Sequence, residues 1–126
     1  MHRRNRLSPL LPALLALALA ACQEDGGRAA SDPGGDKERG AELIASHGCG
    51  ACHRIPGIRG ADGVVGPPLD EFGRRVYVAG MLPNTPDGLV EWLLDPQKIV
   101  PGNAMPAVGL SEDEARDVAS YLHDLR

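Results

Sequence analysis

The stretch Cys49-Gly50-Ala51-Cys52-His53 decides how this chain of 126 residues is organised. Its C-x-x-C-H pattern is typical of covalent attachment of a c-type haem. The spacing has a mechanical reason, because two thiols three positions apart can add to the two vinyl groups of one porphyrin. The adjacent imidazole then reaches the iron. The sequence therefore predicts one covalently bound haem, held by Cys49 and Cys52, with His53 as an iron ligand.

Two other uses of a C-x-x-C pair fit this chain less well. A structural zinc ion takes four ligands, and beyond the motif the mature chain offers only His47, His123 and Cys22. A thioredoxin-type thiol pair occurs in a β-α-β context, and the sequence has no strand–helix–strand pattern. Both alternatives are therefore weaker than haem.

The N-terminus has the features of an export signal. Arg3, Arg4 and Arg6 precede an apolar run of 12 residues, 10–21. A membrane-spanning helix needs about 20 apolar residues, so this run is too short to cross a bilayer. We expect residues 1–21 to be a signal peptide.

The end of this signal is similar to the lipobox of bacterial lipoproteins. Residues 19–22 read Leu-Ala-Ala-Cys, and in lipoproteins the signal is removed just before a cysteine that becomes lipidated. The resemblance implies that Cys22 is the acylated N-terminus of an exported protein, anchored in the membrane and facing the periplasm or another extracytoplasmic space. The alternative is ordinary secretion, with cleavage after residues 18–20.

Composition separates a tether from a folded domain. Residues 22–36 consist of Cys22 and a segment with four Gly, four acidic residues and no large apolar residue, which predicts a flexible linker before a domain at 37–126. The first 21 residues hold three of the 13 Lys+Arg and none of the 17 Asp+Glu, so the mature chain has a net charge of −7 with His neutral. Nucleic-acid binding needs clustered Lys and Arg, so a nucleic-acid partner is excluded.

The domain needs a large apolar group beyond its side chains. It contains only four aromatic residues, and the chain has only three Cys. A small domain without many aromatic side chains or a disulfide framework needs another group to stabilise its core. A covalent haem supplies that apolar bulk. The four aromatic residues are Phe72, Tyr77, Trp92 and Tyr121.

Local signals predict a helix at each end of the domain. We expect the first over 36–47, where Gly40 indicates close contact with the last helix, because a glycine inside a helix costs about 1 kcal/mol relative to alanine. The last helix begins at a capping box formed by Ser111 and Glu114. Its apolar stripe has residues three and four apart: Ala115, Val118, Ala119, Leu122 and Leu125.

A middle helix is expected between two prolines. Thr85 followed by Pro86 predicts its start, and Pro96 predicts its end at Asp95. The chain contains no convincing strand. These patterns together predict an all-α fold of short helices around one haem, with the N- and C-terminal helices crossing.

The second axial position has one well-placed candidate. Met105 lies between two prolines in the loop 101–106, where its thioether sulfur can be presented to the iron. A methionine is ordinarily a core filler, and this is the interpretation for Met81. His47 is too close to the first cysteine to reach the opposite haem face easily, and His123 is expected on the charged side of its helix.

Taken together, the motifs resemble the class I cytochromes c, and closely resemble the cytochrome c domain fused to subunit II of caa3-type haem–copper oxidases. The resemblance covers about residues 37–126. Nothing in the chain resembles the membrane helices or the copper-binding Cys/His cluster of that subunit, so we expect a free-standing carrier domain. The matching segments are Gly40, Cys49–His53, Gly66–Leu69, Phe72–Arg74, Leu82–Pro86, Trp92–Pro96, Pro101–Pro106 and Tyr121–Leu122.

The resemblance implies the cytochrome c fold and a role for each ligand. His53 would be the proximal and Met105 the distal ligand of the iron of haem c. The backbone carbonyl of Pro67 would accept the other ring N–H of His53, and such a bond orients the ring and raises its basicity.

The resemblance also implies contacts around the rim of the haem. Asn103 and Arg74, or Arg75 in its place, would reach the haem propionates. Trp92 would pack beside the haem on the methionine side. The alternative for the two arginines is a solvated surface pair.

The function that the resemblance implies is electron transport and not enzyme catalysis. An iron whose two axial positions are occupied by His and Met cycles between ferrous and ferric states. The resemblance places this cycle in a respiratory chain, between a membrane-bound donor and a haem–copper terminal oxidase. Two alternatives stay open: a ligand-binding or peroxidase-like protein from which Met105 dissociates, and a haem-stapled accessory subunit of an oxidase complex. With only Lys37 and Lys98 available, we expect docking through an apolar haem-edge rim or onto a basic partner.

Overall fold

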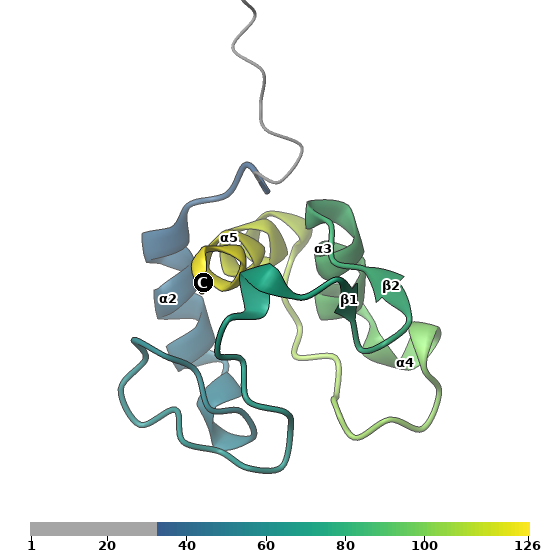
Figure 1. Ribbon diagram of the computed structural model, residues 1–126, viewed down its shortest axis with the longest axis horizontal. Coiled ribbons are helices and arrows are strands. Elements are labelled where there is room, and N and C mark those ends of the chain that lie inside the picture. The colour runs from purple at the N-terminus through teal and green to yellow at the C-terminus, as the bar shows by residue number, and fades with distance from the viewer. Residues whose placement is uncertain (1–32) are drawn as a thin grey trace, which may run out of the picture.

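The computed structural model describes residues 33–126 (Figure 1). The predicted signal peptide, Cys22 and linker residues 23–32 lie outside the described residues. Within the described part the chain is mostly helical, which confirms the predicted all-α class. The elements are α2 (Lys37–Ser46), the 3-10 turns η1 (Cys49–Ala51) and η2 (Phe72–Arg74), β1 (Tyr77–Val78), β2 (Leu82–Pro83), α3 (Pro86–Leu94), α4 (Pro96–Ile99) and α5 (Glu112–Asp124).

Side-chain caps begin the first and last of these helices where the sequence predicts. The carboxylate of Asp36 accepts the N–H of Arg39 at 2.9 Å. In the capping box of α5, the Ser111 hydroxyl accepts the N–H of Glu114 at 3.3 Å, and the Glu114 carboxylate accepts the N–H of Ser111 at 2.9 Å. These caps satisfy N–H groups that have no partner inside the helix, so the boundaries follow from local chemistry.

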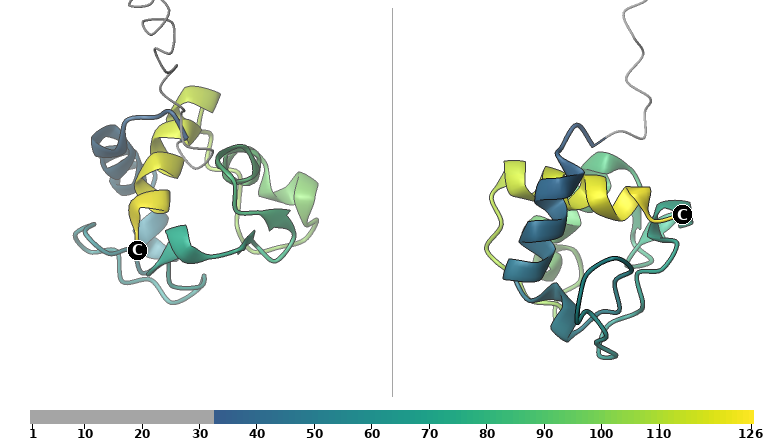
Figure 2. Two further views of the ribbon diagram at one scale, coloured as in Figure 1. Left: turned by 45° about the horizontal axis from the view of Figure 1, so that its top comes forward. Right: turned by 90° about the vertical axis from the view of Figure 1, so that its left-hand side faces the viewer.

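α2 and α5 cross at close range (Figure 2). Gly40 lies at the crossing, where a Cβ would overlap the carbonyl of Asp117 and lie 3.2 Å from the Cβ of Tyr121. Any side chain at this position would therefore push the helices apart, which confirms the predicted reason for a glycine inside the first helix. The buried residues of the two helices include Leu43, Ile44, Ala115, Val118, Ala119 and Leu122.

α3 begins as predicted. The Thr85 hydroxyl accepts the N–H of Gly88 at 3.1 Å, and Pro86 occupies the first turn, where its missing N–H costs nothing. The helix ends at Leu94, and α4 starts directly at Pro96.

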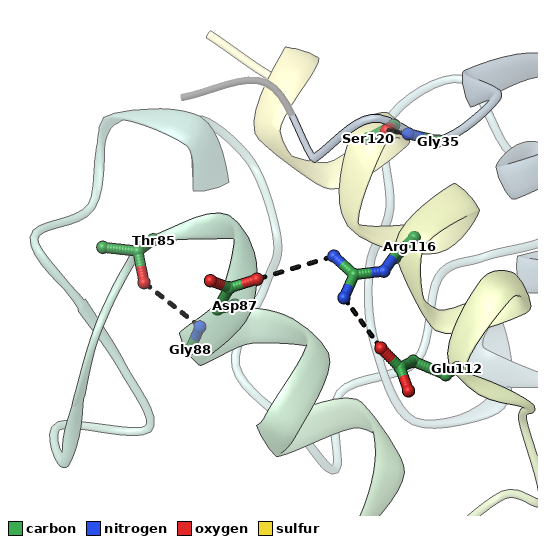
Figure 3. A network of polar contacts seen from close by, with 7 residues as sticks. All are labelled: Gly35, Thr85, Asp87, Gly88, Glu112, Arg116 and Ser120. Carbon is green, nitrogen blue, oxygen red and sulfur yellow. Dashed lines mark hydrogen bonds and ion pairs between the residues drawn. The ribbon is translucent and has the colours of Figure 1, made fainter. Parts of the chain in front are cut away.

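A polar network connects α3 to α5 on the outside of the domain (Figure 3). The Arg116 guanidinium lies 3.5 Å from the Asp87 carboxylate and 2.7 Å from the Glu112 carboxylate. The two carboxylates are largely exposed, so each pair contributes less than about 1 kcal/mol. The network therefore adds little to the stability of the domain.

A short antiparallel hairpin corrects the expectation that the chain has no strand. β1 pairs with β2 in the register Tyr77–Pro83 and Val78–Leu82. The turn between them uses two residues with positive φ, Ala79 at 51° and Gly80 at 71°. Each strand has only two residues, too few for the alternating pattern by which a strand is recognised in a sequence.

The last four residues of the predicted linker pack on the domain. Pro33 is buried, the N–H of Gly35 donates to the Ser120 hydroxyl at 3.1 Å, and the N–H of Asp36 donates to the Asp117 carboxylate at 2.8 Å. The first of these bonds is drawn in Figure 3. Residues 33–36 therefore belong structurally to the folded domain and contact α5.

Candidate haem-binding site

A cavity of about 400 Å³ lies among the helices and the loops. Its inner wall is made of buried apolar side chains, most of them from α2, α3 and α5: Ile44, Ile55, Phe72, Val78, Leu89, Leu93, Val118 and Leu122. Its outer wall is made of exposed loop residues: Gly48, Val65, Pro67, Ala79, Ala104 and Pro106. The cavity therefore opens on the loop side and is closed by the helices.

A second hollow, of about 270 Å³, lies beside Pro33 on α5. It is shallower, its lining is mostly polar, and it contains none of the C-x-x-C-H residues. The Cys and His residues of the motif line the larger, apolar cavity instead.

The motif residues enter the cavity from the turn that follows α2. Gly48, with a φ of 71°, follows the end of α2 and is the N-cap residue of η1. Within this turn the N–H groups of Cys52 and His53 donate to the Cys49 carbonyl at 3.2 and 3.0 Å. Both cysteines are free thiols, half-buried, and line the cavity with His53. Burial raises the pKa of the Cys49 thiol.

The imidazole of His53 is held in one orientation. Its Nδ1 lies 2.8 Å from the Pro67 carbonyl oxygen, and a carbonyl accepts only, so Nδ1 carries the proton. Nε2 then keeps its lone pair, which is the form that ligates a metal. A Cβ at Gly66 would overlap the ring of His53, so the glycine lets the chain pass close beside the imidazole.

The loop of Met105 is held by amide side chains. Asn103 donates to the carbonyls of Pro96 and Val100 at 2.9 and 2.7 Å, and its Oδ1 accepts the N–H of Met105 at 2.7 Å. Met105 is half-buried and lines the cavity. Asn103 also lines it, but its amide is used within the loop. Asn103 therefore positions Met105, and its predicted contact with a haem propionate stays a prediction.

Gln97, in α4, also holds this loop, and the sequence analysis missed it. Its Nε2 donates to the carbonyls of Asn103 and Met105 at 2.9 Å each, and its Oε1 accepts the N–H of Gly102 at 3.1 Å. The only signal in the sequence is its place in the turn after Asp95-Pro96.

The two arginines point to different places. Arg74 pairs with Glu71 at 3.6 Å, with its side chain 63% exposed, and it is not part of the cavity wall. Arg75 lines the cavity, donates to the Pro68 carbonyl, and places its guanidinium 5.1 Å from the centre of the Phe72 ring. Arg75 is therefore the arginine at the site. Trp92 also lines the cavity.

The expectations for His123 and Met81 are wrong, and His47 is part of the cavity wall. His123 is 8% exposed, stacks on Phe72 and hydrogen-bonds Asn84 at 3.0 Å, because η2 packs over this side of α5. Met81 is 60% exposed on the hairpin turn, not in the core. His47 lines the cavity, with its Nδ1 3.0 Å from the Leu43 carbonyl.

Comparison with known proteins now identifies the class. The cytochrome c family model matches residues 37–126. The chain is similar to cytochrome c oxidase subunit 2 of Alkalihalophilus pseudofirmus, with 34% identity over 89 residues that cover 70% of this chain and 25% of the relative. The same subunit of Bacillus sp. is 33% identical over 68% of this chain and 25% of the relative, and that of Bacillus subtilis is 33% identical over 71% and 26%. No solved structure matches the chain.

This protein belongs to the cytochrome c family. It spans about a quarter of the length of the relatives named above. The family binds haem c covalently through a C-x-x-C-H motif and transfers electrons with it, so the family function is that of an electron carrier rather than a catalytic enzyme.

The residues of this chain fit that cofactor. Two free thiols, an imidazole with a lone pair on Nε2 and a thioether all line one cavity with apolar walls. The thiols and the imidazole belong to the segment that follows α2, and the thioether belongs to the loop that precedes α5. These two segments lie on opposite sides of the lower half of Figure 1. Such a donor set would hold a covalently attached haem and supply ligands to its iron.

Proposed function

We propose that this protein is a membrane-anchored carrier of single electrons whose haem iron is ligated by His53 and Met105. The proposal rests on one observation: an imidazole with its Nε2 free and a thioether on a hydrogen-bonded loop line the same apolar cavity. When bound, the haem supplies an iron that takes up and releases one electron.

The chain's own residues hold and tune the site. Cys49 and Cys52 attach the haem covalently, and the Pro67 carbonyl orients His53 and raises its basicity. A methionine ligand raises the reduction potential of a haem relative to a second histidine. Arg75 supplies a positive charge beside the cavity and would hold a haem propionate there. Trp92 and the helical wall exclude water from the iron.

The sequence and the relatives support the anchor and the partners that we propose. Cys22, at the end of a lipobox-like signal, carries the lipid and holds the protein at the membrane on the periplasmic or extracytoplasmic side. Among residues 33–126, no helix is long and apolar enough to span a bilayer. The relatives are oxidase subunits, and the acceptor we propose is a haem–copper terminal oxidase, with a membrane-bound respiratory complex as donor.

An absorption spectrum tests the ligand pair. Purified ferric holoprotein should have the weak far-red band of methionine–iron ligation. Met105→Ala should abolish this band, and Met81→Ala, the matched control on the exposed hairpin, should keep it. A ferrous protein that binds CO at neutral pH with no far-red band in its ferric form would overturn the closed site. It would favour a ligand-binding or peroxidase-like role.

A further inference from the structure

Asn84 lies directly before the N-cap of α3 and bonds to three other parts of the fold. Its backbone N–H donates to the carbonyl of Val76, between η2 and β1, at 2.9 Å. Its side-chain Oδ1 lies 3.0 Å from Nε2 of His123 in α5. Its Nδ2 donates to the carbonyls of Phe72 and Arg75 at 3.0 Å each. The amide therefore connects α5 to both ends of η2.

The orientation of the Asn84 amide follows from these partners. A carbonyl oxygen only accepts hydrogen bonds, so the atom that meets two carbonyls is the nitrogen of the amide. The amide oxygen then faces His123, whose Nε2 carries the proton of this bond. Both N–H groups and the oxygen of the side chain thus have partners. A polar group that is satisfied in this way is held in one orientation and can fix the segment that it binds.

The η2 turn needs support from outside. It has three residues, its N-cap Glu71 has a φ of 52°, and no side chain caps it. A positive φ is unfavourable for a residue other than glycine, so surrounding contacts must hold this turn. One such contact comes from the end of α5, where the Leu125 carbonyl accepts the N–H of Gly73 at 2.8 Å. Figure 1 shows the coil of η2 between the end of α5 and β1.

The bonds from Asn84 bear on the cavity through Arg75. The chain leaves η2 at Arg75, whose backbone is extended, with φ −71° and ψ 147°. Its guanidinium lines the cavity, donates to the Pro68 carbonyl and lies 5.1 Å from the centre of the Phe72 ring. Asn84 thus holds the backbone of the arginine and that of the ring beneath its guanidinium. Its amide helps to set the direction in which the arginine side chain leaves the turn.

We propose that Asn84 is the positioning residue that holds Arg75 at the cavity and thereby raises the reduction potential of the haem. This inference rests on the proposed function, in which Arg75 holds a haem propionate. A cation beside the haem stabilises the ferrous state, because reduction adds a negative charge to the group. Asn84 itself is not part of the cavity wall, so its effect on the potential passes through the arginine.

A double-mutant cycle on the reduction potential tests this path. The holoprotein is titrated with redox mediators as the wild type, Asn84→Ala, Arg75→Ala and the double variant. We expect Asn84→Ala to lower the potential by most of the shift that Arg75→Ala produces. In the double variant the loss of the amide should add almost nothing, because the arginine through which it acts is gone. Equal shifts by Asn84→Ala with and without the arginine would overturn the proposal.

The chemical reactivity of the arginines gives a second readout, which does not depend on the potential. Phenylglyoxal modifies accessible guanidinium groups, and tandem mass spectrometry of the digested protein locates the modified residue. In the wild type, Arg74, with its side chain 63% exposed, should react faster than the half-buried Arg75. In Asn84→Ala the rate at Arg75 should rise toward that at Arg74. An unchanged ratio of the two rates would mean that the amide does not hold the arginine.

Two further variants separate positioning from a general loss of stability. Thr85→Ala removes the cap of α3 but keeps the bonds from Asn84 to η2, so the potential and the ratio of rates should stay at the wild-type values. If Thr85→Ala moves both as far as Asn84→Ala does, the effect is a general loosening and the proposal fails.

Asn84→Asp serves if Asn84→Ala yields no stable holoprotein. It has nearly the size of asparagine and loses both donors to η2, so it should expose Arg75 to phenylglyoxal. Its new charge would lower the potential directly, so this variant is judged by reactivity alone. An Arg75 that stays as protected as in the wild type would contradict the proposal.

The outcomes distinguish this inference from the proposed function. If Arg75→Ala lowers the potential and Asn84→Ala leaves it unchanged, the proposed role of the arginine stands and the amide does not position it. If Arg75→Ala leaves the potential unchanged, the proposed role of the arginine fails, and the effect of Asn84 on the potential is overturned with it. The far-red band of the ferric wild type reports separately whether the His53 and Met105 ligand pair is present.

Discussion

Asn103 offers a sharp test of how the methionine ligand is held. Its amide makes three hydrogen bonds, two to the carbonyls of Pro96 and Val100 and one from the N–H of Met105. Each such bond is worth about 1 kcal/mol net, so Asn103→Ala should weaken the closed loop by about 3 kcal/mol. Since 1.36 kcal/mol is a factor of ten, the population with Met105 off the iron should rise about 150-fold.

Imidazole binding to the ferric holoprotein measures that population. An added ligand binds only the open state, so its apparent dissociation constant falls in proportion as the open fraction rises. Asn103→Ala should therefore bind imidazole about 150-fold more tightly than the wild type. Asn103→Asp keeps the acceptor for the Met105 N–H, but it replaces both donors with a carboxylate oxygen that faces the carbonyls of Pro96 and Val100. The loss of two bonds of about 1 kcal/mol each, together with this repulsion, should tighten imidazole binding by at least about 30-fold.

Thr85→Ala is the control for general destabilisation. It removes the cap of α3, which costs about 1 kcal/mol of folding stability without touching the loop. Imidazole affinity in this variant should stay at the wild-type value. If Asn103→Ala binds imidazole within about twofold of the wild type while its haem remains attached, the amide does not hold the ligand loop and the reasoning fails.

Three further predictions concern charge and protonation. Removing the cation at the cavity in Arg75→Ala favours the ferric state and should lower the reduction potential by about 40 mV, equivalent to about 1 kcal/mol, whereas Arg74→Ala should leave it nearly unchanged in the same redox titration. Burial, with the nearby Arg126, lowers the pKa of His123 below its usual value. The unfolded chain therefore binds the proton more readily, and folding stability should fall as the pH drops below about 6.5, with a smaller fall in His123→Leu when both are unfolded in urea. Oxidation by ferricyanide should depend weakly on salt, because residues 48–84 and 95–110, which supply the exposed wall of the cavity, carry five Lys+Arg against four Asp+Glu; a rate that rises steeply with salt would mean that the net negative charge of the whole chain controls the approach of the anion.

Local chemistry in the sequence is enough to predict several parts of this fold. The caps at Asp36, Ser111 and Thr85 begin helices where expected, because a side chain reaches a backbone N–H two or three residues on. The haem motif is equally local, since its two cysteines and its histidine occupy five consecutive positions. Gly40 indicated the helix crossing because a glycine inside a helix needs a reason outside that helix.

Other features of the structure depend on contacts between segments that are distant in the sequence, and local patterns do not predict these contacts. Arg74 and Arg75 are neighbours in the sequence, and only the direction in which the chain leaves η2 determines which of them reaches the cavity. His123 is buried because η2 covers it. Residues 33–36 have the composition of a linker, yet they pack on α5 because Ser120 and Asp117 meet their N–H groups.

The sequence by itself therefore determined the cofactor, the family and the ends of the helices, because these depend on residues a few positions apart. Only the tertiary structure decided which arginine lines the cavity and how Asn103 and Gln97 hold Met105. Those properties depend on contacts between side chains that are far apart in the sequence, and the spacing of residues along the chain does not predict such contacts.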